Sequence, residues 1–147
     1  MTATQTTTDT AVRVVLIGRD GDRVRVLTFQ RRGGPYRGCW ALPGGMVDTT
    51  EQTLLQAAVR ELAEAGIHLE ACELAEVDSA RTLGGAPVSV AFAALLPDCP
   101  ASTAPSGGRA RWTLLEVAVD TPGMLVPGHH LAITDAIRML DGQAVRR

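Results

Sequence analysis

Two runs of β-branched and apolar residues near the start of the chain predict a pair of strands. Residues 12–18 read VRVVLIG, and residues 24–30 read VRVLTFQ. The turn residues Asp20, Gly21 and Asp22 separate the two runs, and such a connection between apolar runs is typical of a hairpin. We therefore expect these two strands to be adjacent and antiparallel.

A helical pattern follows the first irregular segment. From about residue 50 to residue 65, apolar residues recur at a period near 3.6, which puts them on one face of a helix. Gly66 is suitably positioned to end this helix, and Thr49 with Gln52 predicts a capping box at its start. The residues on the predicted apolar face are Leu54, Leu55, Ala58, Leu62 and Ala65.

The second half of the chain predicts three more strands and a terminal helix. Residues 71–78 and 88–96 have strand composition, and 88–96 is apolar enough to lie in the centre of a sheet. Residues 97–108 are rich in proline, serine and glycine and predict a long loop, which a short strand at 111–115 follows. Apolar spacing from about residue 129 to residue 140 predicts the last helix.

The length and the terminal segments indicate one small domain. The chain has 147 residues, about the size of a single domain. We expect this domain over residues 11–142, with a disordered polar tail over 1–10 and a short tail over 143–147. No run of 18 apolar residues is present, and the N-terminus lacks the basic start and apolar core of a signal peptide. We therefore expect no membrane span and a cytoplasmic location.

Charge and cysteine content exclude further classes of partner and site. The net charge is −2, with acidic and basic residues interspersed, which predicts no duplex nucleic acid as a partner. An anionic ligand would need a cation from solvent or a nearby arginine. The three cysteines are odd in number and match no paired metal spacing, so we expect neither a disulfide framework nor a zinc site.

Two carboxylates on the first predicted helix carry the candidate chemistry. Glu61 and Glu64 are three residues apart, so they are neighbours on the helix surface, beside the apolar face. Their mutual repulsion favours a shared proton or a divalent cation between them. Mg²⁺ prefers oxygen ligands and binds diphosphates together with one or two carboxylates. For an isolated pair, a solvated helix face is the alternative interpretation.

The segment that holds these carboxylates resembles the signature of the Nudix hydrolases. Residues 45–67 read GMVDTTEQTLLQAAVRELAEAGI. The family signature is a glycine, five residues, Glu, seven residues, Arg-Glu-apolar, one residue, Glu-Glu, one residue and Gly-apolar. One extra residue before Arg60 and one fewer before Gly66 bring most fixed positions into agreement. The matching residues are Gly45, Glu51, Arg60, Glu61, Leu62, Glu64, Gly66 and Ile67.

The resemblance extends beyond the signature and implies a fold and an activity. The preceding segment 31–45 resembles the family's lead into the signature, and 89–92 with 111–112 resembles core strands of its ADP-ribose-pyrophosphatase-like branch. The implied fold is an α/β/α sandwich around a mixed sheet. The implied activity is Mg²⁺- or Mn²⁺-dependent hydrolysis of a nucleoside diphosphate linked to another moiety, a class that includes nucleotide sugars and nucleoside triphosphates. A homodimer is left open, because family members are often dimers.

The resemblance also implies roles for individual residues. Glu61 and Glu64 would be metal ligands, and Gly45 would offer its backbone carbonyl to the metal. Arg60 and Glu51 would form an ion pair that orients the helix and the loop before it. One carboxylate would take the proton from the attacking water.

Two departures from the signature affect these roles. Ala65 stands where the family usually has the second Glu of an adjacent pair, which removes one metal ligand or proton acceptor. The extra residue before Arg60 rotates a helix by about 100° unless the loop or first turn absorbs it. Contact between Glu51 and Arg60 depends on that adjustment.

Four further residues are candidates for substrate binding. Arg31, Arg32 and Arg37 lie in the glycine-rich segment that leads into the signature. His129 lies where this branch of the family often has a histidine before its last helix. A histidine at a helix start also has packing and capping roles, which is the alternative for His129.

Three functions remain open from the sequence. The first is the divalent-metal-dependent hydrolase. The second is a Nudix-fold ligand-binding or sensing domain with weak or no hydrolysis, which Ala65 and the altered spacing favour. The third is a Nudix-fold enzyme of specialised metabolism with a different diphosphate substrate. Recognition of the base and leaving group depends on loop shapes, so the substrate, the number of metal ions and the catalytic base stay open.

Overall fold

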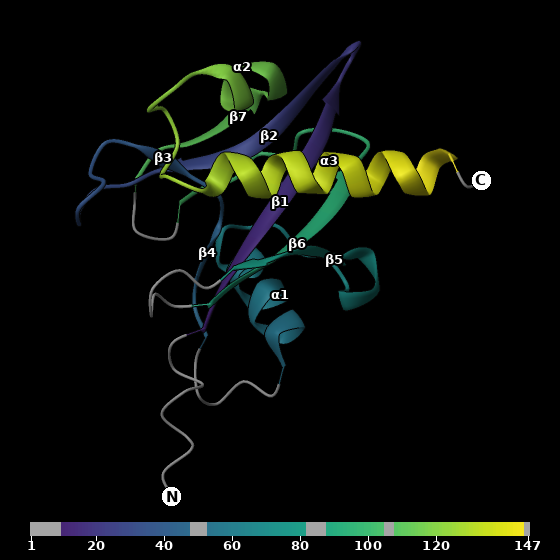
Figure 1. The fold of residues 1–147 in the computed structure, drawn as a ribbon, viewed down its shortest axis with the longest axis horizontal. Helices are drawn as coiled ribbons and strands as arrows, with labels where there is room; N and C mark the ends of the chain where they lie inside the picture. The colour runs from purple at the N-terminus through teal and green to yellow at the C-terminus, as the bar shows by residue number, and fades with distance from the viewer. Residues whose placement is uncertain (1–9, 48–52, 82–87, 105–107, 146–147) are drawn as a thin grey trace, which may run out of the picture.

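The computed structural model describes residues 10–47, 53–81, 88–104 and 108–145. These residues form four strands, a helix, a 3₁₀ turn, three strands and two helices, in that order along the chain (Figure 1). The elements are β1 (Thr10–Asp20), β2 (Arg23–Gln30), β3 (Trp40–Ala41), β4 (Gly44–Met46), α1 (Leu54–Glu64), the 3₁₀ turn η2 (Ala71–Glu73), β5 (Ala75–Arg81), β6 (Val88–Leu96), β7 (Ala110–Leu114), α2 (Leu115–Asp120) and α3 (His129–Val145).

One mixed sheet holds all seven of these strands. Its main path is β3-β2-β1-β6-β5, while β4 pairs with β1 and β7 pairs with β2. The predicted hairpin is confirmed: β1 and β2 are antiparallel, and Gly21 in the turn has a φ of 62°. β1 and β6 run parallel along the whole of β6, and the other pairings are antiparallel. As expected, β6 is an interior strand, with β1 on one side and β5 on the other.

Alternate residues of β1 face two separate hydrophobic cores. Val12, Val14 and Leu16 pack with the buried face of α1, including Ala58 and Leu62. Val15 and Ile17 pack on the other face of the sheet with buried residues of α2 and α3. Figure 1 shows α3 crossing over the sheet. Because successive side chains of a strand point to opposite faces, an apolar strand can support both layers. The predicted α/β/α sandwich is confirmed.

Helix α1 begins four residues later than the predicted start near residue 50. Thr53 Oγ1 accepts a hydrogen bond from Gln56 N at 3.0 Å, and Gln56 Oε1 accepts one from Thr53 N at 3.2 Å. This reciprocal pair is a capping box. The capping predicted for Thr49 and Gln52 lies outside the described residues.

The end of α1 agrees with the prediction. Gly66 has a φ of 86°, and Ile67 N donates to Leu62 O at 2.9 Å. A glycine in the left-handed region followed by this bond is the Schellman ending of a helix. Ile67 is buried in the same core as α1, so the chain leaves the helix toward the sheet.

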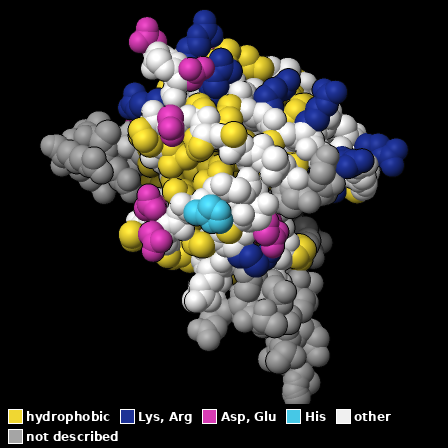
Figure 2. All heavy atoms as spheres, turned by 180° about the vertical axis from the view of Figure 1, so that it is seen from behind, with side chains coloured by type: hydrophobic (Ala, Val, Ile, Leu, Met, Phe, Trp, Pro, Cys, Tyr) yellow, Lys and Arg dark blue, Asp and Glu magenta, His cyan; other side chains and the backbone are white. Residues whose placement is uncertain are grey.

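Four short elements were not predicted: β3, β4, α2 and the 3₁₀ turn η2, which occupies the start of the strand expected over 71–78. β3, β4 and α2 lie in segments whose composition indicates loop or strand, and α3 continues to Val145 instead of ending near residue 140. The two short strands form because their backbones pair with β1 and β2, which local composition does not reveal. Among the described residues, no helix has both the length and the apolar character needed to cross a bilayer. On the face seen in Figure 2, acidic and basic side chains are spread around hydrophobic ones.

Candidate active site

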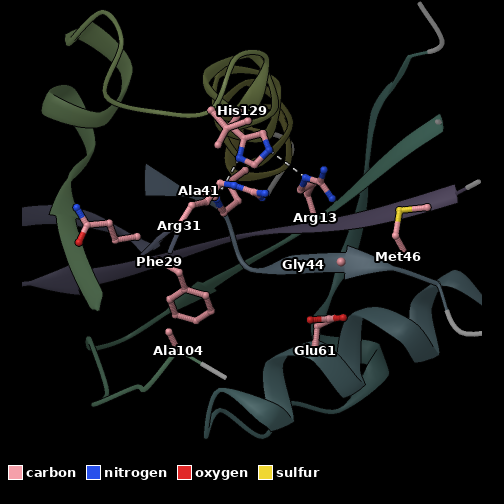
Figure 3. A pocket seen from close by; sticks show the side chains of 13 residues that line it. Arg13, Phe29, Arg31, Ala41, Gly44, Met46, Glu61, Ala104 and His129 are labelled. Atoms are coloured by element: carbon pink, nitrogen blue, oxygen red, sulfur yellow. Dashed lines mark hydrogen bonds between the residues drawn. The ribbon is translucent and has the colours of Figure 1, made fainter. Parts of the chain in front are cut away.

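A cavity of about 420 Å³ lies where the sheet divides. β1 pairs with β2 only at the hairpin end, between Ile17–Asp20 and Arg23–Val26. At the other end β1 pairs instead with β4. The cavity is lined by residues from the diverging strands, from α1 and from the start of α3 (Figure 3). Side chains from both faces of the sheet therefore meet in one space.

One side of the cavity carries the carboxylate of Glu61, next to the backbone of Gly45. We call these two residues the carboxylate wall. Gly45 pairs with Val12, whose side chain faces α1, so position 45 also faces α1. A Cβ atom at Gly45 would lie 2.7 Å from Glu61 Oε2. The glycine therefore lets the carboxylate approach the backbone of β4. At Gly44, with a φ of 155°, a Cβ would meet the carbonyl oxygen of Val12.

Arg60 links the two predicted metal ligands. Its Nη1 atom lies 3.2 Å from Glu61 Oε2 and 3.0 Å from Glu64 Oε2. The Glu61 side chain is 12% exposed, whereas that of Glu64 is 46% exposed. Glu61 lines the cavity, while Arg60 and Glu64 are not among its lining residues. The predicted partner of Arg60, Glu51, lies outside the described residues.

The oxygen atoms that α1 and the neighbouring backbone offer are the type of ligand that a hard divalent cation binds. A carboxylate against a glycine backbone, with a second carboxylate one turn away, offers the oxygen ligands that Mg²⁺ and Mn²⁺ accept. Within the described ranges, no group of three or more His, Cys, Asp or Glu residues could hold a metal. The described oxygen donors are therefore Glu61, Glu64 and the backbone beside Gly45.

Ala65 does not face this cavity. Its side chain is fully buried, and its carbonyl accepts hydrogen bonds from Ser102 Oγ at 2.9 Å and Thr103 N at 3.2 Å. In this register a carboxylate at position 65 would lie in the core, where an unpaired charge is costly. The altered spacing within the signature therefore turns this position away from the candidate metal ligands.

The opposite side of the cavity is cationic, and we call Arg13, Arg31 and His129 the arginine wall. Arg13 Nε lies 3.0 Å from His129 Nε2, and Arg13 Nη1 donates to Val12 O at 3.0 Å. Leu42 N lies 3.1 Å from His129 Nδ1, and the neutral ring accepts a hydrogen bond at one of these two nitrogens. Figure 3 shows these side chains on one side of β4 and Glu61 on the other.

Arg13 was not predicted from the sequence as a site residue. It lies on β1 two residues before Val15, so its side chain is on the face that packs against α3. His129 is the first residue of α3, 116 positions away. The sequence feature that could have indicated Arg13 is its charge inside the otherwise apolar run of residues 12–18.

Burial and positive charge determine the protonation of the arginine wall. Burial, with Arg13 and Arg31 nearby, lowers the pKa of His129 to about 3. Burial and Arg31 also lower the pKa of Arg13, whereas Glu61 acts in the opposite direction. A neutral imidazole at pH 7 can accept one hydrogen bond and adds no further positive charge to the wall.

The other predicted arginines lie at the surface. Arg31 lines the cavity, but Arg32 and Arg37 are exposed residues outside its lining. Arg32 lies over Gly108, where an added Cβ would be 3.1 Å from its Cδ atom. Two hydrogen bonds hold the backbone of Arg31: Arg31 N donates to Cys39 O at 2.8 Å, and Gly38 N donates to Arg31 O at 2.9 Å. Of the three predicted arginines, only Arg31 faces the space in front of Glu61.

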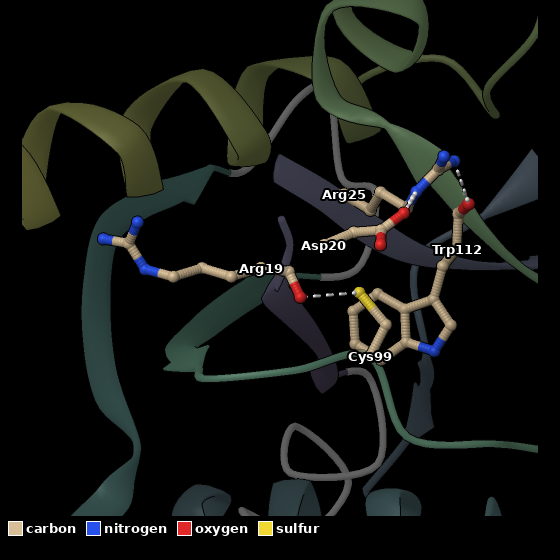
Figure 4. Close-up of polar contacts among 5 residues, drawn as sticks. All are labelled: Arg19, Asp20, Arg25, Cys99 and Trp112. Atoms are coloured by element: carbon tan, nitrogen blue, oxygen red, sulfur yellow. Dashed lines mark hydrogen bonds and ion pairs between the residues drawn. The ribbon is translucent and has the colours of Figure 1, made fainter. Parts of the chain in front are cut away.

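Both tryptophans have structural contacts away from the cavity. The guanidinium of Arg111 lies 4.2 Å from the ring centroid of Trp40, an arrangement typical of a cation–π contact. Trp112 Nε1 donates to Pro100 O at 2.8 Å, and the Trp112 carbonyl accepts from Arg25 at 3.2 Å (Figure 4). Neither ring lines the cavity.

The depressed pKa of His129 predicts a specific dependence of stability on pH. The unfolded chain takes up this proton below about pH 6.5, whereas the folded chain does so only near pH 3. Stability therefore falls as the pH falls through this window. Between pH 7 and pH 4, we expect His129 to account for a loss on the order of 3 kcal/mol in the free energy of unfolding.

Urea unfolding at a series of pH values measures this contribution. His129→Gln should show a shallower decline between pH 7 and pH 4 than the unmodified chain. The adjacent His130 is exposed, so His130→Gln serves as the matched control and should retain the full decline. Equal pH slopes for His129→Gln and the unmodified chain would contradict a buried neutral imidazole.

Comparison with known proteins identifies the family. The sequence model of the NUDIX domain matches residues 7–129. This chain belongs to the Nudix family. The resemblance of residues 45–67 to the Nudix signature is thereby confirmed, although the signature is altered at Ala65.

Individual Nudix relatives share the fold or part of the sequence. The chain is 45% identical over 40 residues to an ADP-ribose pyrophosphatase of Methanocaldococcus jannaschii, a match that covers 27% of this chain and about a quarter (23%) of that protein. It is 27% identical to the NUDIX domain of Shewanella oneidensis NrtR complexed with ADP ribose, with a TM-score of 0.73 over 88% of this chain and 86% of that one. NrtR complexed with a 27mer DNA shares the fold at 23% identity, with a TM-score of 0.71 over 92% of this chain and 64% of that one.

Proposed function

We propose that this Nudix protein hydrolyses a nucleoside diphosphate linked to another moiety, with the help of Mg²⁺ or Mn²⁺. The observation that supports the proposal is the cavity in which Glu61, against the backbone of Gly45, faces Arg13 and Arg31. Oxygen donors on one side suit a divalent cation, and arginines on the other suit phosphate oxygens. A diphosphate is the ligand whose chemistry matches both sides.

In the proposed reaction, water attacks one phosphorus atom of the diphosphate. A bond forms between the water oxygen and that phosphorus, the bond from phosphorus to the bridging oxygen breaks, and the bridging oxygen leaves on the second phosphate. The products are two monophosphates, and the proton from water passes to a carboxylate. Such displacement depends mainly on alignment and on stabilisation of charge.

Glu61, Glu64 and the backbone carbonyl of Gly45 would hold the cation. When bound, a divalent cation neutralises charge on the diphosphate and makes water more acidic. Arg60 contributes by holding the two carboxylates in a fixed relation through its Nη1 atom, and we retain Glu51 as its proposed partner in the loop. Arg31 and His129 would contact the substrate inside the cavity, with Arg32 and Arg37 near its mouth. The proposed partner is a small molecule in the cytoplasm, with no nucleic acid or membrane involved and a homodimer left open.

ADP-ribose is the first substrate to test. An ADP-ribose pyrophosphatase shares a segment with this chain, and the related NUDIX domain of NrtR was solved with ADP ribose. Incubation of the purified chain with ADP-ribose, nucleotide sugars and nucleoside triphosphates in Mg²⁺ should release two phosphorylated products from at least one compound. For ADP-ribose these products are AMP and ribose 5-phosphate, which chromatography separates. A lack of turnover across the panel, with binding retained, would refute the hydrolase.

A ligand-sensing domain is the second candidate. It is supported by the altered signature and by the likeness to the NUDIX domain of NrtR, a protein also solved with DNA. Calorimetry separates the two proposals when ADP-ribose is titrated in EDTA and again in Mg²⁺. Equal binding in both conditions without turnover supports sensing, whereas turnover that requires Mg²⁺ supports hydrolysis.

A further inference from the structure

A second hollow, of about 540 Å³, lies at the hairpin end of β1, away from the candidate active site. It is bounded by the hairpin turn and the start of β2, by α2 and by Ile137 of α3 (Figure 1), and we call it the α2 groove. It shares no lining residue with the active-site cavity. Arg13, in that cavity, and Asp20, at the hairpin, are seven residues apart on β1, or about 23 Å at a rise of about 3.3 Å per residue.

The floor of the α2 groove is apolar. It is lined by Val24, Leu115, Val119 and Ile137, all of which are partly buried against the core between the sheet, α2 and α3. Leu115 and Val119 are four residues apart, so they lie on the same side of α2. Because these side chains are only partly buried, a ligand that covers them removes further apolar surface from water, which favours binding.

The rim of the α2 groove is acidic. Asp22, Glu116 and Asp120 line it with exposed side chains. Arg23 is the only positively charged side chain among the described residues of the lining. Three carboxylates against one guanidinium leave an excess of negative charge, which attracts a cationic ligand.

The two rim carboxylates on α2 have no counter-charge within the part of the chain that the structure describes. Glu116 and Asp120 form no ion pair there. They are four residues apart, and two like charges at this spacing destabilise a helix. Asp120 is also the last residue of α2, where the helix dipole favours a positive charge. A cationic group at the rim offsets both effects.

We propose that the α2 groove docks a basic segment of a partner protein, with an apolar side chain of that segment on the floor and arginine or lysine side chains on the rim. An apolar centre with an exposed polar rim is the usual anatomy of a protein–protein interface. The apolar anchor supplies most of the affinity, whereas the exposed charges supply specificity and faster association. Because the rim carboxylates are exposed, they fit cationic side chains that stay in contact with water better than a small cation enclosed in a pocket.

Fluorescence anisotropy with the full chain tests this docking site. The probe is a labelled synthetic peptide that alternates arginine with leucine, and two control peptides replace either leucine with serine or arginine with glutamate. At low ionic strength the arginine–leucine peptide should bind saturably and at least about tenfold more tightly than either control. Equal binding of the arginine–serine peptide, or no saturable binding of the arginine–leucine peptide, would overturn the proposal.

Two double variants locate the bound peptide. The rim variant, Glu116→Gln with Asp120→Asn, should weaken binding about fivefold, since it removes two exposed charge–charge contacts. The matched control, Glu76→Gln with Asp98→Asn, removes the same two charges from exposed positions outside the groove. Its affinity should stay within about twofold of the unmodified chain. Equal affinities of the rim variant and the matched control would place the peptide elsewhere and contradict the docking site.

Arg23→Gln should change the affinity in the opposite direction. It removes the positive charge from the described lining, so the basic peptide should bind about twofold more tightly. Weaker binding to Arg23→Gln would count against an acidic rim that recognises cations. The substituted side chains in all these variants are exposed, so we expect unchanged thermal unfolding midpoints.

Sedimentation velocity distinguishes a partner protein from a second copy of this chain. A monomer that binds the arginine–leucine peptide supports the proposal. Self-association that the rim variant abolishes, without peptide binding, would assign the α2 groove to a second copy and overturn the proposal.

Discussion

Glu61→Gln should lower kcat for the diphosphate substrate by at least about 100-fold, which corresponds to the loss of roughly 3 kcal/mol of transition-state stabilisation. Glu61 is the only carboxylate that lines the cavity among the described residues, and its side chain is 12% exposed. Glutamine has nearly the same shape but lacks the charge that a divalent cation requires. Steady-state kinetics in Mg²⁺ with the substrate found in the panel measures this effect.

Two variants show whether the effect belongs to the cavity. Glu64→Gln should reduce kcat less, by about tenfold, because Glu64 is 46% exposed and paired with Arg60 outside the cavity. Glu76 on β5 is exposed and not a lining residue, so Glu76→Gln should hydrolyse at the unmodified rate. A normal rate for Glu61→Gln would remove this carboxylate from the reaction.

Leu62→Ala should lower the free energy of unfolding by about 2–5 kcal/mol. Leu62 is completely buried between α1 and the sheet, in the core that also holds Val12, Val14 and Leu16. Truncation removes apolar contacts and leaves a cavity that the surrounding β-branched residues cannot readily fill. Urea unfolding followed by circular dichroism measures the loss.

The control for this change is a leucine on another helix. Leu131 on α3 is 42% exposed, so Leu131→Ala should cost less than about 1 kcal/mol. Because Leu62 adjoins Glu61, we also expect Leu62→Ala to raise the metal concentration needed for half-maximal activity at temperatures where the chain is folded. A loss below 1 kcal/mol for Leu62→Ala would mean that α1 is not anchored through this residue.

Local patterns were enough to predict the hairpin and the apolar face of α1. Asp20, Gly21 and Asp22 are turn residues, and the turn they form joins β1 to β2. The period of Ala58 and Leu62 identified the buried side of the helix. These features depend on neighbours within a few residues, so their signal is present in short segments.

Local sequence patterns predicted less well where α1 begins and which strands the glycine-rich segment forms. Thr53 caps α1, although several threonines nearby have similar capping preference. β3 and β4 are two and three residues long, too short for a recognisable period. Their strand conformation depends on pairing with β2 and β1, and pairing partners far along the chain leave no local pattern.

From the sequence itself came the helix that carries Glu61, through its apolar period, and the family, through a signature of closely spaced residues whose resemblance implied the sandwich fold. Only the tertiary structure decided which charged groups share the cavity. It joined Arg13 to His129 across 116 positions and separated Glu61, inside the cavity, from Glu64 at the surface. The physical reason is that the meeting of two side chains depends on strand register and helix packing, which connect residues that are distant in the chain.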